Sequence, residues 1–267
     1  MEKLVVLGTG RAMVTKCYNT CFTLFDGQEH LLVDAGGGNG IMTQLELAAI
    51  PYTSIKNAFL SHCHTDHVLG MVWMVRKVTT MMLSNKYHDI FTIYSHAEAI
   101  NSLKTLCLAT LVPSMINLFG SRIQFVAVED GETAQVGAYA LTFFSIHSKK
   151  MTQFGFSTQL LNGKKLVFMG DEPLHPLCHP HAQHSDWLLH EAFCLYEDRE
   201  RFRPYEKHHS TVKEACQNAT TLGAKTIVLW HTEDSQLSQR RTLYEREGKQ
   251  FFDGSVLVPD DLDEISL

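Results

Sequence analysis

The sequence has no long apolar run, no paired cysteines and no excess of basic residues. No stretch approaches the ~18 apolar residues that a membrane-spanning helix needs, and the first apolar stretch ends at Gly8, too early for a signal peptide. The seven cysteines are odd in number and scattered, and they form no C-x-x-C pair, a pattern typical of a reduced intracellular chain. These absences predict a cytoplasmic protein that does not contact membranes.

The charge balance also limits the function classes. With 23 Lys plus Arg against 29 Asp plus Glu, the formal net charge is −6. Sequence-independent nucleic-acid binding needs a broad basic face, so this charge excludes it, although a local basic patch is still allowed. The hydrophobic fraction of 45% is sufficient for a sizeable core. No repeat, low-complexity tract or linker divides the chain, and we expect one domain over residues 1–267.

Strands and helices are predicted in two groups along the chain. Asn162-Gly163 indicates a hairpin, and Thr211 with Glu214 indicates a capping box at a helix start. The predicted strands cover residues 3–7, 20–25, 30–33, 58–60, 89–94, 123–128, 141–146, 155–161, 165–169, 186–189 and 226–230. The predicted helices cover residues 41–50, 68–83, 95–111, 211–222 and 236–247. This order favours two mixed β-sheets packed face to face with helices outside. The acidic residues 259–264 are expected to form a solvated edge.

The most informative stretch is residues 57–67, where a short apolar strand runs into an H-x-H-x-D-H motif. Imidazole and carboxylate groups are the ligands that zinc and similar divalent ions take in hydrolytic sites. In an extended segment, His62 and His64 can face one point together. Asp66 and His67 follow after the chain turns and can face a second point. The spacing therefore predicts two adjacent metal ions.

Three further strands end on a ligand-type residue, namely His147, Asp171 and His231. In layered α/β folds, sites gather at the carboxyl ends of strands, so these side chains are expected to meet the first motif. Together the residues supply two sets of three ligands and one carboxylate, Asp171, that can bridge two ions. For His147 or His231 alone, a hydrogen-bonded core histidine is the alternative interpretation.

Two other segments have plainer interpretations. The four glycines in residues 36–40 favour close packing beside the metal motif over phosphate binding, since no Lys-Ser/Thr pair follows them. The histidine-rich residues 175–184 contain no clean ligand spacing, and we interpret them as a loop.

The order His62-Cys-His64-Thr-Asp66-His67, then His147, Asp171 and His231, resembles the metallo-β-lactamase superfamily. The resemblance spans most of the chain and implies a four-layer αβ/βα sandwich, with two mixed β-sheets flanked by helices. It also implies a two-ion site. One ion would take His62, His64 and His147; the other would take Asp66, His67 and His231; Asp171 would lie between them.

Smaller motifs favour the ribonuclease Z-like branch: Leu7-Gly-Thr-Gly, Gly170-Asp171, His190-Glu191 and His209-Ser210-Thr211. His209 directly precedes a capped helix, whose N-terminus favours a phosphate. An imidazole there can protonate a leaving oxygen, and Glu191 can orient it. The predicted catalytic residues are Asp66, His209 and Glu191. The candidate substrate-binding residues are Ser210, Thr211, Lys16 and Asn19.

The resulting expectation is a two-ion hydrolase, a phosphodiesterase similar to ribonuclease Z and its RNA or tRNA 3′ end endonuclease activity, that uses a metal-bridging hydroxide. The sequence has no long basic arm of the kind that grips tRNA in ribonuclease Z. A small substrate, such as a cyclic nucleotide or another phosphodiester, is therefore the alternative, ahead of a lactone or thioester. A metal-binding module without catalysis is a more distant one. The expected cofactors are two divalent ions, Zn²⁺ first and Mn²⁺ or Fe²⁺ next, and the expected assembly is a homodimer.

Overall fold

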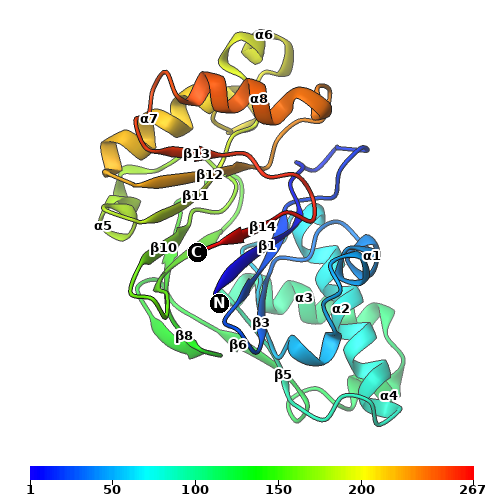
Figure 1. Cartoon of the computed structure of the whole chain (residues 1–267). Coiled ribbons are helices and arrows are strands. Elements are labelled where there is room, and N and C mark those ends of the chain that lie inside the picture. The colour runs from blue at the N-terminus through cyan, green and yellow to red at the C-terminus, as the bar shows by residue number, and fades with distance from the viewer.

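Two seven-stranded β-sheets face each other in the computed structural model, which describes residues 1–267 (Figure 1). The first sheet has the strand order β14-β1-β2-β3-β4-β5-β6 and the second the order β13-β12-β11-β10-β9-β8-β7. Each sheet is mixed. In the first, β14 to β3 are antiparallel and β3 to β6 parallel; in the second, β7 to β10 are antiparallel and β10 to β13 parallel.

The strands of the first sheet are β1 (Lys3–Gly8), β2 (Cys21–Phe25), β3 (His30–Val33), β4 (Asn57–Phe59), β5 (Phe91–Ser95), β6 (Ile123–Ala127) and β14 (Glu264–Ser266). Those of the second are β7 (Thr133–Val136), β8 (Tyr139–Ser145), β9 (Phe154–Gln159), β10 (Lys165–Phe168), β11 (Trp187–Glu191), β12 (Thr226–Trp230) and β13 (Ser255–Leu257). The hairpin predicted at Asn162-Gly163 joins β9 and β10.

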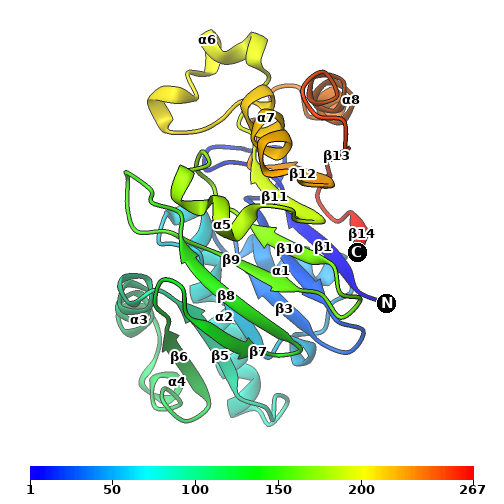
Figure 2. The same cartoon turned by 90° about the vertical axis from the view of Figure 1, so that its left-hand side faces the viewer.

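Helices cover the outer face of each sheet (Figures 1 and 2). Beside the first sheet lie α1 (Gly40–Leu47), α2 (Thr65–Leu83), α3 (Ala97–Thr110) and α4 (Pro113–Ile116). The second half of the chain contains α5 (His179–Ala182), α6 (Arg199–Phe202), α7 (Val212–Leu222) and α8 (Leu237–Gly248). Short 3₁₀ turns lie at η1 (Tyr52–Ser54), η2 (Pro176–Cys178), η3 (Tyr196–Asp198) and η4 (Tyr205–Lys207). No helix has the length and apolar character that crossing a bilayer requires.

Alternation along the strands produces three separate cores. In β1, Leu4 and Val6 belong to the core between the sheets, whereas Val5 and Leu7 belong to the core under α1 to α4. A third core lies between the second sheet and α7 and α8. The middle core is aromatic, and Phe22 of the first sheet stacks on Trp230 of the second at 4.8 Å between ring centroids. Three cores between four layers confirm the predicted αβ/βα sandwich.

The prediction for residues 259–264 is right in part. The side chains of Asp260 and Glu264 are 49% and 52% exposed, and Glu264 begins the edge strand β14. The segment is nevertheless ordered by the buried Arg240 of α8, whose guanidinium donates to Asp260 Oδ1 at 2.8 Å and to the carbonyl of Pro259 at 2.7 Å. Asp261 accepts from Tyr18 N at 2.5 Å and from Thr9 Oγ1 at 2.8 Å. The chain then adds β14 to the edge of the first sheet.

Candidate metal centre

The H-x-H-x-D-H motif lies where β4 ends and α2 begins. Helix α2 starts at Thr65, with His64 as its N-cap residue in extended conformation. His62 precedes the helix, whereas Asp66 and His67 lie in its first turn. All three of these side chains are buried. The change from strand to helix therefore separates His62 and His64 from Asp66 and His67, which are the two pairs that the spacing predicts.

The glycine-rich segment packs against this helix, as predicted. A Cβ on Gly70 of α2 would lie 1.7 Å from the carbonyl oxygen of Ala35, and Gly70 N donates to the carbonyl of Gly36 at 2.8 Å. Gly36 has a φ of 71°, a backbone conformation that residues other than glycine rarely adopt. The glycines thus allow the loop after β3 to approach the start of α2.

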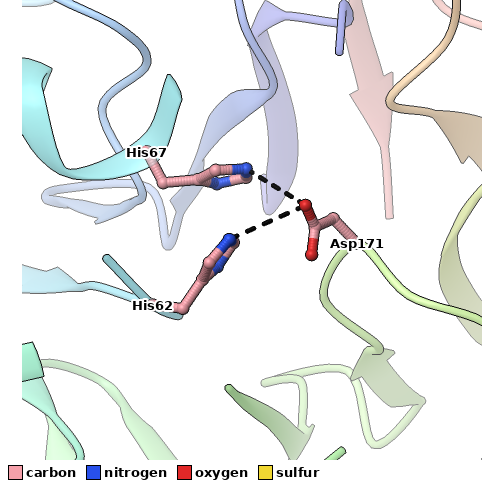
Figure 3. Close-up of side chains that lie close together, drawn as sticks. All are labelled: His62, His67 and Asp171. Carbon is pink, nitrogen blue, oxygen red and sulfur yellow. Dashed lines mark ion pairs between the residues drawn. The ribbon is translucent and has the colours of Figure 1, made fainter. Parts of the chain in front are cut away.

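Five ligand-type side chains form two overlapping groups of three. In each group the candidate ligand atoms all lie within 4.8 Å of one another. One group is His62, His67 and Asp171; the other is Asp66, His67 and His231. Asp171 Oδ2 lies 3.7 Å from His62 Nε2 and 3.5 Å from Nε2 of both His67 and His231. Figure 3 shows the Asp171 carboxylate pointing between the rings of His62 and His67. Asp171 thus occupies the central position that the sequence predicts for it.

The topology explains why distant residues meet here. Strands β10 and β12 are parallel to one another, and Asp171 and His231 follow their carboxyl ends. His231 has a φ of 55°, and Asp34, which follows β3, has a φ of 54°. Left-handed backbone is uncommon outside glycine and often marks functional sites. These turns end the strands abruptly and leave the polar side chains at the shared edge.

Two predicted ligands, His64 and His147, lie outside both groups. His64 Nδ1 is 2.8 Å from His62 Nε2, so His64 lies next to a member of the first group. His147 follows β8, where φ is 57°, and its ring packs 4.9 Å from the ring of His175. Of the expected set of His62, His64 and His147, the first two lie together, whereas the ring of His147 packs on the histidine-rich segment after β10.

Sequence reasoning missed Asp34, which orients the shared ligand. Its Oδ2 accepts from His67 Nδ1 at 2.8 Å and from Ser61 Oγ at 2.7 Å, and its Oδ1 accepts from Ser61 N at 2.8 Å. This leaves His67 Nε2 free to face the centre. A carboxylate on the second nitrogen fixes the orientation of a histidine ligand and raises its basicity. The available signal was an aspartate directly after a buried strand, followed by glycines.

The electrostatics favour a cation at the centre. Burial alone would lower the pKa of His67, but Asp66 and Asp34 outweigh it and raise this pKa well above its usual value. Burial lowers the pKa of His231 to about 4 and that of His62 well below its usual value, so both rings are neutral near pH 7. Neutral imidazoles are the form that binds metals. Nearby carboxylates and neutral rings thus match the donor set of a divalent ion.

Unpartnered buried atoms support the same fit. His67 Nε2 and Asp171 Oδ1 are buried without a hydrogen-bond partner. An unpaired buried polar atom is costly, and native proteins rarely leave one without a ligand, water or ion. Both belong to the groups of three, and imidazole with carboxylate suits zinc, manganese or iron. The residues present therefore fit a divalent metal pair.

His209 and Glu191 lie beside the centre, as predicted. The His209 ring is 5.2 Å from the ring of His231, and its Nδ1 is 3.6 Å from Glu191 Oε2, too long for a direct hydrogen bond. Burial lowers the pKa of His209 to about 4 and raises the pKa of Glu191 to about 7. Glu191 Oε1 instead accepts from Ser210 N at 2.5 Å. Glu191 therefore supports the His209 segment chiefly through the backbone.

Ser210 and Thr211, which are predicted to bind substrate, do not line the cleft that contains His209. Both are buried, and the Ser210 amide is bound to Glu191. The Thr211 hydroxyl and amide both bind Glu214 in the predicted capping box. The start of α7 is thus already capped by the chain itself, which corrects the prediction that its free amides bind phosphate.

Lys16 and Asn19 are also displaced from the predicted role. Asn19 Nδ2 donates to the carbonyl of Arg11 at 2.8 Å, so its amide holds the loop between β1 and β2. Lys16 Nζ donates to the carbonyl of Asp234 at 3.3 Å and lines a separate cavity with Arg240 and Arg241. Neither residue lines the cleft at the metal centre.

A cleft of about 510 Å³ opens on the centre. Asp66, Asp171 and His231 form part of its floor, and His64 and His209 lie beside them. Its other lining residues include three cationic side chains, Arg11, Lys150 and Lys207. A cleft with metal-ligand residues on one side and cations around them suits an anionic substrate.

A protein-family comparison identifies the group to which the chain is related. Residues 2–252 match the model of the family described as Anti-Pycsar protein Apyc1. The chain belongs to this family. The match includes every residue of the two groups of three, as well as His209 and Glu191.

Other relatives of this Apyc1 family chain are ribonucleases and metallo-β-lactamase-fold proteins. A ribonuclease Z of Thermococcus sibiricus is 23% identical over 305 positions, which include all of this chain and 97% of the relative. The metallo-β-lactamase-fold protein YhfI of Bacillus subtilis superposes with a TM-score of 0.80 at 19% identity, covering 99% of this chain and 98% of YhfI. The short form of human tRNase Z gives 0.73 at 20% identity, covering 99% and 98%. The metallo-β-lactamase fold and the resemblance to ribonuclease Z are confirmed.

Proposed function

We propose that this protein is a metal-dependent phosphodiesterase. The observation that carries the proposal is the pair of ligand groups, which share His67 and adjoin through Asp171, beside a cleft that Arg11, Lys150 and Lys207 also line. The relatives named ribonuclease Z support hydrolysis of a phosphodiester.

We assign the metal ligands as His62, His67 and Asp171 for one ion and Asp66, His67 and His231 for the other. A single imidazole nitrogen cannot ligate two ions, so His67 Nε2 would bind only one of them. At the other ion His64, which is adjacent to His62, is the nearest ligand that could replace it. His147 would join by turning from His175. Two divalent ions, when bound, supply Lewis acidity and activated water for displacement at phosphorus. Zn²⁺ is our first choice, followed by Mn²⁺ and Fe²⁺.

The remaining residues have roles that follow from their positions. His209 lies on the cleft wall next to His231 and is placed to hold or deliver a proton at the leaving oxygen. Its imidazole is neutral near pH 7, since burial lowers its pKa to about 4, and the negative charge of a bound phosphate would raise that value. Glu191 supports the segment that holds His209.

The substrate is either an RNA 3′ end or a small phosphodiester. The ribonuclease Z relatives favour RNA. The size of the chain favours the small substrate: its 267 residues align with a relative over 305 positions, so it lacks segments that the relative has. A cleft of about 510 Å³ is large enough for a mononucleotide-sized ligand. We further propose a cytoplasmic homodimer, which light scattering of the purified protein would test.

The direct test is hydrolysis of bis(p-nitrophenyl) phosphate by metal-loaded protein. We expect the wild-type protein to turn over this substrate, to lose that activity on chelation and to regain it when metal is added back. Asp66→Ala should show no turnover. A panel that runs from cyclic nucleotides to precursor tRNA then separates the two substrate classes. Activity on a lactone or thioester, with none on any phosphodiester, would refute the proposal.

A further inference from the structure

One cationic side chain in the cleft, Lys150, is held much closer to the metal centre than the sequence suggests. It lies in the loop after β8, next to the exposed Lys149. Lys150 Nζ is 3.5 Å from His209 Nε2 and 3.5 Å from Glu172 Oε1. Glu172 directly follows the candidate ligand Asp171, so Lys150 is joined both to the loop that carries Asp171 and to the wall that carries His209.

Glu172 is itself firmly placed. Its side chain is only 6% exposed, and its Oε1 accepts from Ser148 Oγ at 2.8 Å. The same hydroxyl oxygen accepts from the backbone amide of Lys150 at 3.1 Å. These contacts connect the backbone and the ammonium of Lys150 to one carboxylate. The side chain, which is 24% exposed, is therefore held at the cleft by these contacts.

The ammonium group of Lys150 has one N–H donor available for a ligand in the cleft. An ammonium has three N–H groups and no acceptor. Glu172 and His209 face two of them, and Lys150 also lines the cleft above Asp66, Asp171 and His231. The third N–H group remains for an acceptor that enters the cleft.

The other two cations of the cleft are placed differently. Arg11 and Lys207 both lie over the Phe193 ring, each 5.0 Å from its centroid. Phe193 in turn stacks on the outer side of His209 at 4.9 Å. Lys150 is thus the cationic side chain that contacts His209 directly, and His209 adjoins the ligand His231.

The centre holds several carboxylates, which repel an anionic substrate. Asp66, Asp171 and Glu172 are all buried here. We propose that Lys150, positioned by Glu172, donates a hydrogen bond to a nonbridging oxygen of the substrate phosphate and so adapts this centre to anionic esters. This inference rests on the proposed function, because it names the residue that recognises the phosphodiester of that same site.

Binding of inorganic phosphate to the metal-loaded protein tests the inference without requiring turnover. We expect Lys150→Met to weaken phosphate binding roughly tenfold, since hydrogen bonds that involve charged groups are among the stronger ones and this one is partly exposed. Lys149→Met is the matched control, because its side chain is exposed and does not line the cleft, and its affinity should stay within about twofold of the wild type. Lys150→Arg retains the charge and should recover most of the affinity. Glu172→Gln should cause a smaller loss than Lys150→Met.

Calorimetric titration with phosphate, together with metal content and melting temperature of each variant, separates the outcomes. Equal phosphate affinity in Lys150→Met and Lys149→Met, with normal metal content, overturns the inference. A loss of affinity in Lys150→Met alone supports it even where the wild type cleaves no phosphodiester, and in that case only the proposed function fails. Normal cleavage with no role for Lys150 in phosphate binding leaves the proposed function standing and removes the inference.

Discussion

The two halves of the molecule build their shares of the metal centre in different ways. The first half supplies His62, Asp66 and His67 from one continuous segment, and a hydrogen-bond network through Ser61 and Asp34 holds His62 and His67. The second half supplies its residues one at a time from separate strand ends. The first half thus takes its three residues from one segment supported by hydrogen bonds to Asp34, whereas the second half depends on the convergence of separate strand ends.

The buried polar atoms show the same contrast. In the second half, several site atoms are buried without partners: Asp171 Oδ1, His231 Nδ1, His209 Nδ1 and Glu191 Oε2. In the first half, His67 Nε2 is buried without a hydrogen-bond partner, whereas the polar side-chain atoms of His62 and Asp34 have partners. An unsatisfied buried group costs roughly 1–3 kcal/mol, so the second half is the less completely satisfied of the two. Of its four unpartnered atoms, Asp171 Oδ1 is the one that a bound ion can reach directly, whereas His209 Nδ1 and Glu191 Oε2 face each other.

The largest effect should come from breaking the contact between the halves at His67. We expect His67→Ala and His231→Ala each to lose one of the two ions, because the free Nε2 of His67 can ligate only one ion. Activity of His67→Ala should fall by more than about 100-fold, since loss of a ligand exceeds the 10- to 100-fold cost of losing an outer partner. Elemental analysis of each variant measures the stoichiometry. Retention of both ions by His67→Ala would contradict the assignment of His67 as a metal ligand.

Asp34 and Glu191 provide a matched pair of supporting carboxylates, one in each half. Asp34→Asn should lower metal affinity roughly 10- to 100-fold, because Asp34 binds His67 directly. Glu191→Gln should leave metal affinity within about threefold, since Glu191 has no direct hydrogen bond to a metal ligand. Competition with a chromophoric chelator gives both affinities. If Glu191→Gln weakened metal binding as much as Asp34→Asn, Glu191 would support a metal ligand as directly as Asp34 does, and the contrast between the two halves would fail.

Chelation should affect the second half more than the first. Removing ligand present at 100 times its Kd lowers the free energy of unfolding by about 2.7 kcal/mol. Locally, we expect faster amide exchange after chelation in residues 146–152 and 170–173, where unsatisfied or separately placed side chains lie. Residues 57–67 should retain their protection, because the Ser61–Asp34 contacts persist. Hydrogen exchange followed by mass spectrometry of the metal-loaded and chelated protein measures the difference, with the strand at residues 3–8 as an internal reference.

The smallest effect concerns pH and lies away from the centre. Burial lowers the pKa of His30 in β3 to about 4, while its ring nitrogen binds Thr23 Oγ1 at 2.8 Å. In the unfolded chain His30 binds a proton with a pKa near 6.5. Its contribution to the free energy of unfolding is therefore fully present above pH 6.5 and is lost as the pH decreases towards 4. After allowance for solvent screening the loss is roughly 1–2 kcal/mol. His30→Gln should flatten this part of the stability curve measured by urea unfolding, and an unchanged slope would exclude His30 as its cause.

Local signals predicted most of the elements. The capping box at Thr211, the hairpin at Asn162-Gly163 and the buried strand at residues 226–230 all form as expected, because turn chemistry and apolar alternation act over a few residues. The edge strand β14 escaped prediction, since it has only 3 residues, follows an acidic segment and is stabilised by pairing with β1. The acidic segment before it is ordered by the buried Arg240, from another part of the chain.

What the sequence by itself determined is the identity of the ligand-type residues and their place at strand ends, since H-x-H-x-D-H and the later histidines and aspartates are readable from residue type and spacing. The tertiary structure alone decided their grouping. It placed Asp171 between His67 and His231, added Asp34, turned His147 towards His175, and brought Lys150 to His209 instead of Lys16. The physical reason is that these contacts join segments far apart in the chain, and only the packing of two sheets determines which strand ends meet.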